Sequence, residues 1–106
     1  MSKGAAFLIL LCCAFLESGG DALMRKGMQT GRVVLYIGAA LVLALYGWLV
    51  NRPPWSFGAL LGVYVSLFFV AAQILGYVFY GERITLPIAV GGALILAGGV
   101  TITVWR

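Results

Sequence analysis

Residues 4–24 read GAAFLILLCCAFLESGGDALM, an apolar run interrupted by the carboxylate of Glu17. A helix of this length covers about 30 Å, which is the thickness of the hydrocarbon core of a membrane. Nothing basic lies within seven residues of Glu17 on either side. Keeping an acidic side chain inside a membrane helix costs roughly 2.5–3.5 kcal/mol on insertion scales. The run therefore predicts a membrane helix whose carboxylate has a use, and it indicates the binding or movement of a cation or a proton.

The composition of the whole chain also indicates a membrane protein. Of the 106 residues, 63% are hydrophobic and 9% are charged, whereas an ordinary globular domain has roughly 25% charged residues. We predict an all-α membrane protein in which residues 1–106 form a single domain of four transmembrane helices. The spans are expected at about 4–24, 33–50, 57–80 and 86–104. The loops between them are short, so successive helices should be antiparallel neighbours.

Polar residues, glycine and proline separate the apolar runs. Residues 25–32 are largely polar or basic and are expected to close the first span with a short loop. The tandem proline at 53–54 stops the second run, because proline cannot continue a helix. Gly81 is the expected cap of the third helix, and Pro87 suits the first turn of the fourth.

The basic residues divide almost evenly between the two expected sides of the membrane. Three lie on one side (Lys3, Arg52 and Arg106) and four on the other (Arg25, Lys26, Arg32 and Arg83). They stand at the ends of apolar runs, so anchoring at headgroups explains them better than binding to nucleic acid. An excess of Lys and Arg sets the orientation of a membrane protein, and three against four is almost no excess. The count leaves open a chain that inserts both ways, which suits an antiparallel dimer, or a weakly biased chain with one orientation.

Glu17 shares a helix face with Gly20 and Asp21. Gly20 is expected to leave open space beside the carboxylate, as a ligand cavity would require, although a packing role is equally open. Apolar surroundings favour the protonated form of a carboxylic acid, so Glu17 is expected to exchange a proton for a cation. The other interpretation is a structural carboxylate satisfied by hydroxyl or backbone groups. Asp21 stands four residues before Arg25 and is expected to pair mainly with it, or else to act as an outer relay.

Other kinds of chemistry find little support in the sequence. Cys12 and Cys13 are adjacent on one expected helix and the chain has no histidine, so we expect no metal site and no disulfide framework. There is no nucleophile with a nearby base and no phosphate-binding glycine loop, so we expect neither an enzyme nor a cofactor. Aromatic side chains inside the spans, Tyr46, Trp48 and Tyr64, could face a cationic ligand or serve packing and interfacial anchoring.

Four stretches of the chain carry a resemblance to a known family. They are Glu17 with Gly20 and Arg25, then Arg32, Gly38 and Trp48, then FYGERITLP at 79–87, and finally Gly91 and Gly98. Over nearly its whole length the chain resembles the small multidrug resistance family of the drug/metabolite transporter superfamily. The resemblance implies an antiparallel dimer whose two membrane glutamates bind either protons or a cationic substrate, with alternating exchange expelling the substrate.

The resemblance also implies roles for individual residues. Glu17 would be the coupling residue, and the fourth helices would pair across the dimer through Gly91 and Gly98. Tyr64 falls where the family has a tryptophan that lines the pocket. The chain departs from the family's multidrug members at residues 66–68, Ser-Leu-Phe, where they have a flexible Gly-x-Gly segment.

We therefore predict a proton-coupled exporter of small or lipophilic cations in a bacterial-type inner or plasma membrane. The residues expected to bind substrate and protons are Glu17, Gly20, Asp21, Tyr64 and Trp48, and those of the dimer interface are Gly91 and Gly98. The partner would be a second copy, in an antiparallel homodimer, or a short paralogous chain. The alternative is a flippase or accessory subunit for lipids or lipid-linked sugars, favoured by the bulky Leu67 and Phe68.

Overall fold

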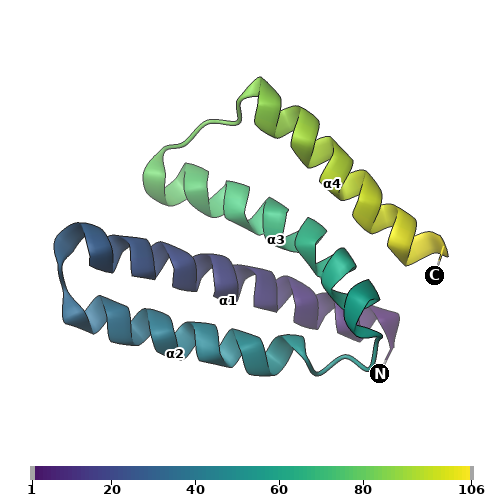
Figure 1. Ribbon diagram of the computed structural model, residues 1–106, viewed down its shortest axis with the longest axis horizontal. Coiled ribbons are helices and arrows are strands. Elements are labelled where there is room, and N and C mark those ends of the chain that lie inside the picture. The colour runs from purple at the N-terminus through teal and green to yellow at the C-terminus, as the bar shows by residue number, and fades with distance from the viewer. Residues whose placement is uncertain (1, 106) are drawn as a thin grey trace.

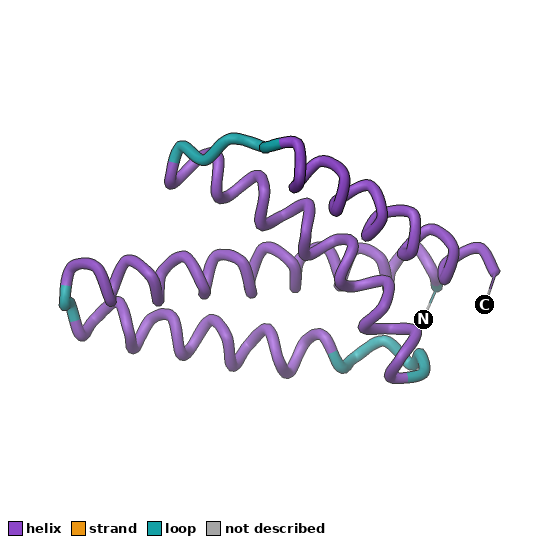
Figure 2. The backbone as a smooth tube through the Cα atoms, turned by 45° about the horizontal axis from the view of Figure 1, so that its top comes forward, coloured by secondary structure: helices purple, strands orange, loops and turns teal. Residues whose placement is uncertain are grey.

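Four helices make up the computed structural model, which describes residues 2–105 (Figure 1). They are α1 (Lys3–Thr30), α2 (Val33–Val50), α3 (Phe57–Tyr80) and α4 (Leu86–Trp105). Each is long and apolar enough to cross a membrane, and short loops join them (Figure 2). The predicted all-α membrane fold with four spans is confirmed, whereas the dimer stays a prediction.

The first helix is longer than its apolar run. Its predicted end, Met24, lies six residues before the last helical residue, Thr30. The loop expected at 25–32 is therefore wrong for residues 25–30, which are helical, and only residues 31–32 separate α1 from α2. The helix ends where Gly31 takes a left-handed conformation (φ 70°) and donates to the carbonyl of Gly27 at 2.7 Å. A polar stretch marks where a helix leaves the hydrocarbon, but a helix of 28 residues is about 42 Å long. Its last turns therefore extend beyond the roughly 30 Å core.

The other helix ends follow local sequence signals. Gly81 caps α3 in the left-handed conformation (φ 63°), which glycine adopts without a steric penalty. The N–H groups of Gly81 and Glu82 donate to the carbonyls of Tyr77 and Gly76, both at 3.1 Å, so two carbonyls at the helix end are satisfied. Pro87 lies in the first turn of α4, where its missing N–H costs nothing.

The helices form an open layer rather than a closed bundle. In the described part of the chain, α1 packs against α2 and α3, whereas α4 packs against α3 alone (Figure 1). The Cα atoms extend over 45 × 34 × 18 Å. The buried core is small and lies where α1 meets α3 and the end of α2 (Leu10, Cys13, Ala14, Val50, Leu60, Val63, Tyr64 and Ala71). Much apolar surface is thus left outside the monomer's core.

Two glycines let α4 approach α3 closely. A methyl group at Gly92 would lie 2.5 Å from the ring of Phe69, and one at Gly99 would overlap the side chain of Ser66. The Ser66 hydroxyl donates to the carbonyl of Ile95 at 3.2 Å, which ties the two helices together. These glycines therefore face α3.

The Gly99→Ala variant is expected to be less stable than the parent protein. Its methyl group would force Ser66 to turn away from the carbonyl of Ile95 or push α4 off α3. Overpacking of this kind typically costs about 1–3 kcal/mol, against a gain in helix propensity of about 1 kcal/mol. The unfolding temperature in detergent measures the difference. The matched control is Gly47→Ala, which adds a methyl group in open space; equal responses would contradict the close packing.

Candidate functional site

The carboxylate of Glu17 is hydrogen-bonded between two helices. The Tyr64 hydroxyl on α3 donates to Oε1 of Glu17 on α1, with an O···O distance of 2.7 Å. The same hydroxyl lies 3.2 Å from the carbonyl oxygen of Cys13, one turn earlier on α1. A tyrosine hydroxyl has one proton to donate, so the two acceptors compete for it. Tyr64 is 4% exposed, while Glu17 is half-buried and so keeps part of its surface accessible.

Aromatic rings from α2 and α3 pack around Tyr64, the donor of this hydrogen bond. The Tyr46 ring stacks on the Tyr64 ring with centroids 5.7 Å apart, and Phe68 lies 6.1 Å from Tyr64 on the same helix. Tyr46 is also close enough to Glu17 for the two side chains to interact electrostatically. A carboxylate next to aromatic faces is an arrangement that suits a cation.

Tyr46 therefore contributes the aromatic ring from α2 that the sequence assigned to Trp48. The structure does not bring Trp48 to Glu17: it is 59% exposed, and its ring lies 4.4 Å from the guanidinium carbon of Arg52. Tyr46 and Trp48 are two positions apart, which is about 200° around a helix. Both are aromatic residues of the same span, so only the rotation of α2 against α1 distinguishes them.

Gly20 does not provide the expected open space. It is buried, and a methyl group there would lie 2.7 Å from Cδ2 of Leu43 on α2. The absent side chain is used for helix packing, and the expectation of a ligand cavity at Gly20 is wrong. Open space exists one residue earlier, at Gly19, where nothing lies within 4 Å.

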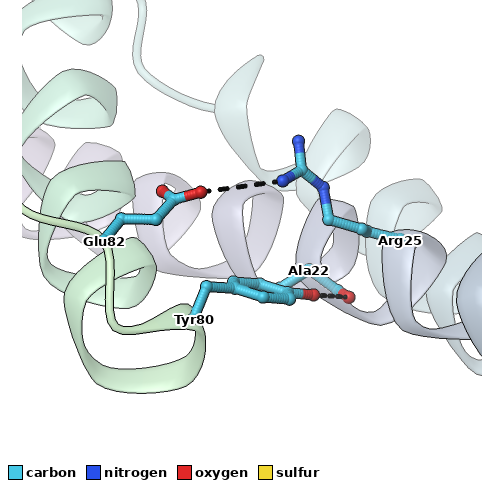
Figure 3. Close-up of polar contacts among 4 residues, drawn as sticks. All are labelled: Ala22, Arg25, Tyr80 and Glu82. Atoms are coloured by element: carbon cyan, nitrogen blue, oxygen red, sulfur yellow. Dashed lines mark hydrogen bonds and ion pairs between the residues drawn. The ribbon is translucent and has the colours of Figure 1, made fainter.

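Asp21 and Arg25 do not form the predicted ion pair. Nη1 of Arg25 instead lies 3.8 Å from Oε2 of Glu82, just beyond the end of α3, and both side chains are about 60% exposed (Figure 3). The Arg25 guanidinium also lies 5.5 Å from the centre of the Tyr80 ring, and the Tyr80 hydroxyl donates to the carbonyl of Ala22 at 2.8 Å (Figure 3). These contacts join the last third of α1 to the end of α3. The ion pair itself is worth little, because exposed pairs contribute about 0–1 kcal/mol.

A cavity of about 390 Å³ lies between α1 and α3 on the side of this ion pair. Ser18, Asp21, Gln73 and Glu82 are among its polar lining residues. Glu17 does not line it, although the cavity begins at the next residue along the chain. Asp21 thus lies at a polar opening one turn from the carboxylate, apart from the Glu17–Tyr64 contact. Among residues 2–105, no three His, Cys, Asp or Glu side chains are grouped so that they could hold a metal ion.

The fold and the site together define a small four-helix, multi-pass membrane protein with a carboxylate held between two of its helices. The chain is 32% identical to a UPF0060 membrane protein of Mycobacterium marinum over 95 residues, which are 88% of this chain and 86% of that protein. It is 30% identical to a UPF0060 membrane protein of Saccharopolyspora erythraea over 93 residues, 86% of this chain and 84% of that one. The chain therefore belongs to the family of UPF0060 membrane proteins. No family model and no solved structure matches it.

Proposed function

We propose that this protein exports small or lipophilic cations in exchange for protons, with Glu17 as the group that binds both. The observation that carries the proposal is the 2.7 Å hydrogen bond from Tyr64 to a carboxylate inside an apolar helix. Such intramembrane acids are rare and are typical of ion or proton pathways. The proposal includes the kinship to small multidrug resistance transporters that the motifs indicate, and a place in the inner or plasma membrane.

The Tyr64 hydroxyl links the two states of the exchange. When Glu17 is ionised, Tyr64 donates to it, and a cation can rest on the open side of the carboxylate against the Tyr46 ring. When a proton neutralises Glu17, the attraction for the cation is lost. The hydroxyl of Tyr64 can then turn to the Cys13 carbonyl, which lies 3.2 Å away. One proton bound thus releases one positive charge.

A second copy of the chain, in antiparallel orientation, completes the site in this proposal. In one monomer the helices form an open layer, and Glu17 is only partly buried. On α4, Gly91 and Gly98 have no atom within 4 Å of an added methyl group, because the adjacent Gly92 and Gly99 are the ones that face α3. Small residues on an open helix face allow another helix to approach closely. The nearly equal numbers of basic residues expected on the two sides of the membrane suit a chain that inserts in both orientations.

Replacing Gly91 and Gly98 together by leucine is expected to weaken the dimer at least about tenfold, which is about 1.4 kcal/mol. The added side chains meet nothing within one chain, so the monomer should still fold. Cross-linking in vesicles measures the fraction of dimer. The control is Gly47→Leu, an open glycine of α2. Unchanged cross-linking in the double variant would place the partner elsewhere.

Proton release on cation binding tests the proposed function. Purified protein in weakly buffered detergent solution receives tetraphenylphosphonium, as a lipophilic cation, or guanidinium, as a small one. If the cation and the proton share Glu17, binding of the cation should displace the proton, and a pH electrode should detect its release. Binding of both cations without any release, at every pH, would contradict proton-coupled export.

The alternative function is the handling of lipids or lipid-linked sugars together with a paralogous chain. Phe68 favours it, because its bulky ring lies near Tyr64, with the ring centroids 6.1 Å apart, where the multidrug members of the resembled family have a small, flexible segment. This alternative predicts that the protein purifies as a complex with a second short membrane protein. A homodimer that binds cations would exclude it.

A further inference from the structure

A long apolar groove lies on the face of α1 that points away from Glu17. It encloses about 1010 Å³, and its lining includes Leu11, Phe15, Gly19 and Leu23 along α1, with Lys26 and Arg32 at one end. Phe15 and Gly19 are each two residues from Glu17, which is about 200° around the helix. Neither Glu17 nor Tyr64 lines the groove, so it is separate from the proposed transport site.

The length of the groove suits one leaflet of a bilayer. From Leu11 to Lys26 the chain rises about 22 Å at 1.5 Å per residue. Half of a hydrocarbon core of about 30 Å is about 15 Å, so the groove extends from mid-membrane into the headgroup region. Gly19 lies between these ends and leaves space, because no atom comes within 4 Å of an added methyl group.

The charges of the groove are confined to its headgroup end and are all positive. Lys26 and Arg32 line the groove there, and no acidic residue does. Both side chains are exposed, and within residues 2–105 neither takes part in an ion pair. Two basic side chains without an ion-pair partner among the described residues thus stand at the end of an apolar groove. This arrangement is complementary to a molecule with a negative head and an apolar tail.

We infer that this groove binds one anionic glycerophospholipid, with an acyl chain along Leu11–Leu23 and its phosphate at Lys26 and Arg32. A second copy of the chain fits the groove less well. An antiparallel copy would bring its own basic end, with Lys3 and Arg52, toward these two bases, and like charges oppose such contact. An anionic lipid would instead neutralise Lys26 and Arg32 with its phosphate and fill the apolar groove with its acyl chain.

Lipid titration of the delipidated protein, followed by native mass spectrometry, tests this assignment. The probes are dioleoyl-phosphatidylglycerol and dioleoyl-phosphatidylcholine, which share their chains but differ in net charge. We expect one phosphatidylglycerol per chain to bind at least about fivefold more tightly than phosphatidylcholine. Lys26→Gln and Arg32→Gln should each weaken phosphatidylglycerol binding about fivefold, since a base near the membrane surface contributes about 1 kcal/mol.

Matched variants distinguish lipid binding in the groove from nonspecific attraction of anionic lipid to the basic residues at that end of the protein. Arg83→Gln removes a base at the same end that does not line the groove, and it should leave binding unchanged. Gly19→Leu should block the acyl chain and weaken both lipids, whereas Gly38→Leu, in open space on α2, should not. Equal affinity for the two lipids, or an equal loss in Arg83→Gln, would overturn the assignment.

The free thiol of Cys12 can show whether a lipid or a second copy of the chain occupies the groove. Cys12 is exposed and lines the groove, while Cys13 is buried. In a Cys13→Ala background, added phosphatidylglycerol should slow maleimide labelling of Cys12. A disulfide between the Cys12 residues of two copies, formed equally with and without lipid, would overturn the assignment in favour of a second chain.

Discussion

The Glu17→Gln variant is expected to release no protons when a cationic ligand is added and to bind that ligand at least about 100-fold more weakly, about 2.8 kcal/mol. Glutamine has nearly the same shape, and its carbonyl can still accept the hydrogen bond from Tyr64. It has neither the negative charge that holds a cation nor a proton to exchange. Calorimetry with tetraphenylphosphonium, together with a pH electrode in weak buffer, measures both losses.

Glu82→Gln is the matched control for this variant. Glu82 is the other glutamate of the chain, and its pairing with Arg25 is exposed to solvent. Removing an exposed ion pair changes stability by about 0–1 kcal/mol, so cation binding and proton release should both survive. Coupled release that persists in Glu17→Gln, or that is lost equally in both variants, would contradict the role of Glu17.

Tyr64→Phe is expected to weaken cation binding about 10- to 100-fold near neutral pH. The variant keeps the ring that stacks on Tyr46 but removes the hydrogen bond to the carboxylate. A hydrogen bond to a charged group contributes about 1.5–3 kcal/mol. Without it the charged carboxylate that holds the cation loses one of its hydrogen-bond donors. Calorimetric titration with tetraphenylphosphonium measures the loss of affinity.

The control for Tyr64→Phe is Tyr77→Phe, on the same helix. Tyr77 is 68% exposed and lies outside the site, so its hydroxyl should not affect cation binding. If Tyr64→Phe binds cations like the parent protein at every pH, the hydrogen bond to Glu17 is structural only. An equal loss of affinity in Tyr77→Phe would indicate a general effect of removing a hydroxyl from α3 rather than the loss of this hydrogen bond.

The sequence by itself determined the four helices. A span inside a membrane must satisfy its own backbone hydrogen bonds, and an apolar run of about 20 residues does so as a helix. The helices α2 and α3 coincide with the second and third apolar runs, and Gly81 ends α3 through its own backbone freedom. The end of α1 was missed, because polarity shows where a chain leaves the membrane and not where its helix stops.

Glu17 could also be singled out from the sequence, since a carboxylate in an apolar run is conspicuous wherever the helices lie. Its neighbours were decided by the tertiary structure. Tyr46 rather than Trp48 reaches the site because of how α2 is rotated against α1. The same rotation places Leu43 over Gly20, where open space was expected.

Arg25 is another residue whose partner the sequence alone does not determine. Asp21, four residues away on the same helix, is the partner that spacing predicts, but the structure pairs Arg25 with Glu82, just beyond the C-terminal end of α3. Spacing along one helix determines which residues share a face. It does not determine which residue of another helix meets that face, because that depends on how two helices rotate and shift against each other as their side chains pack.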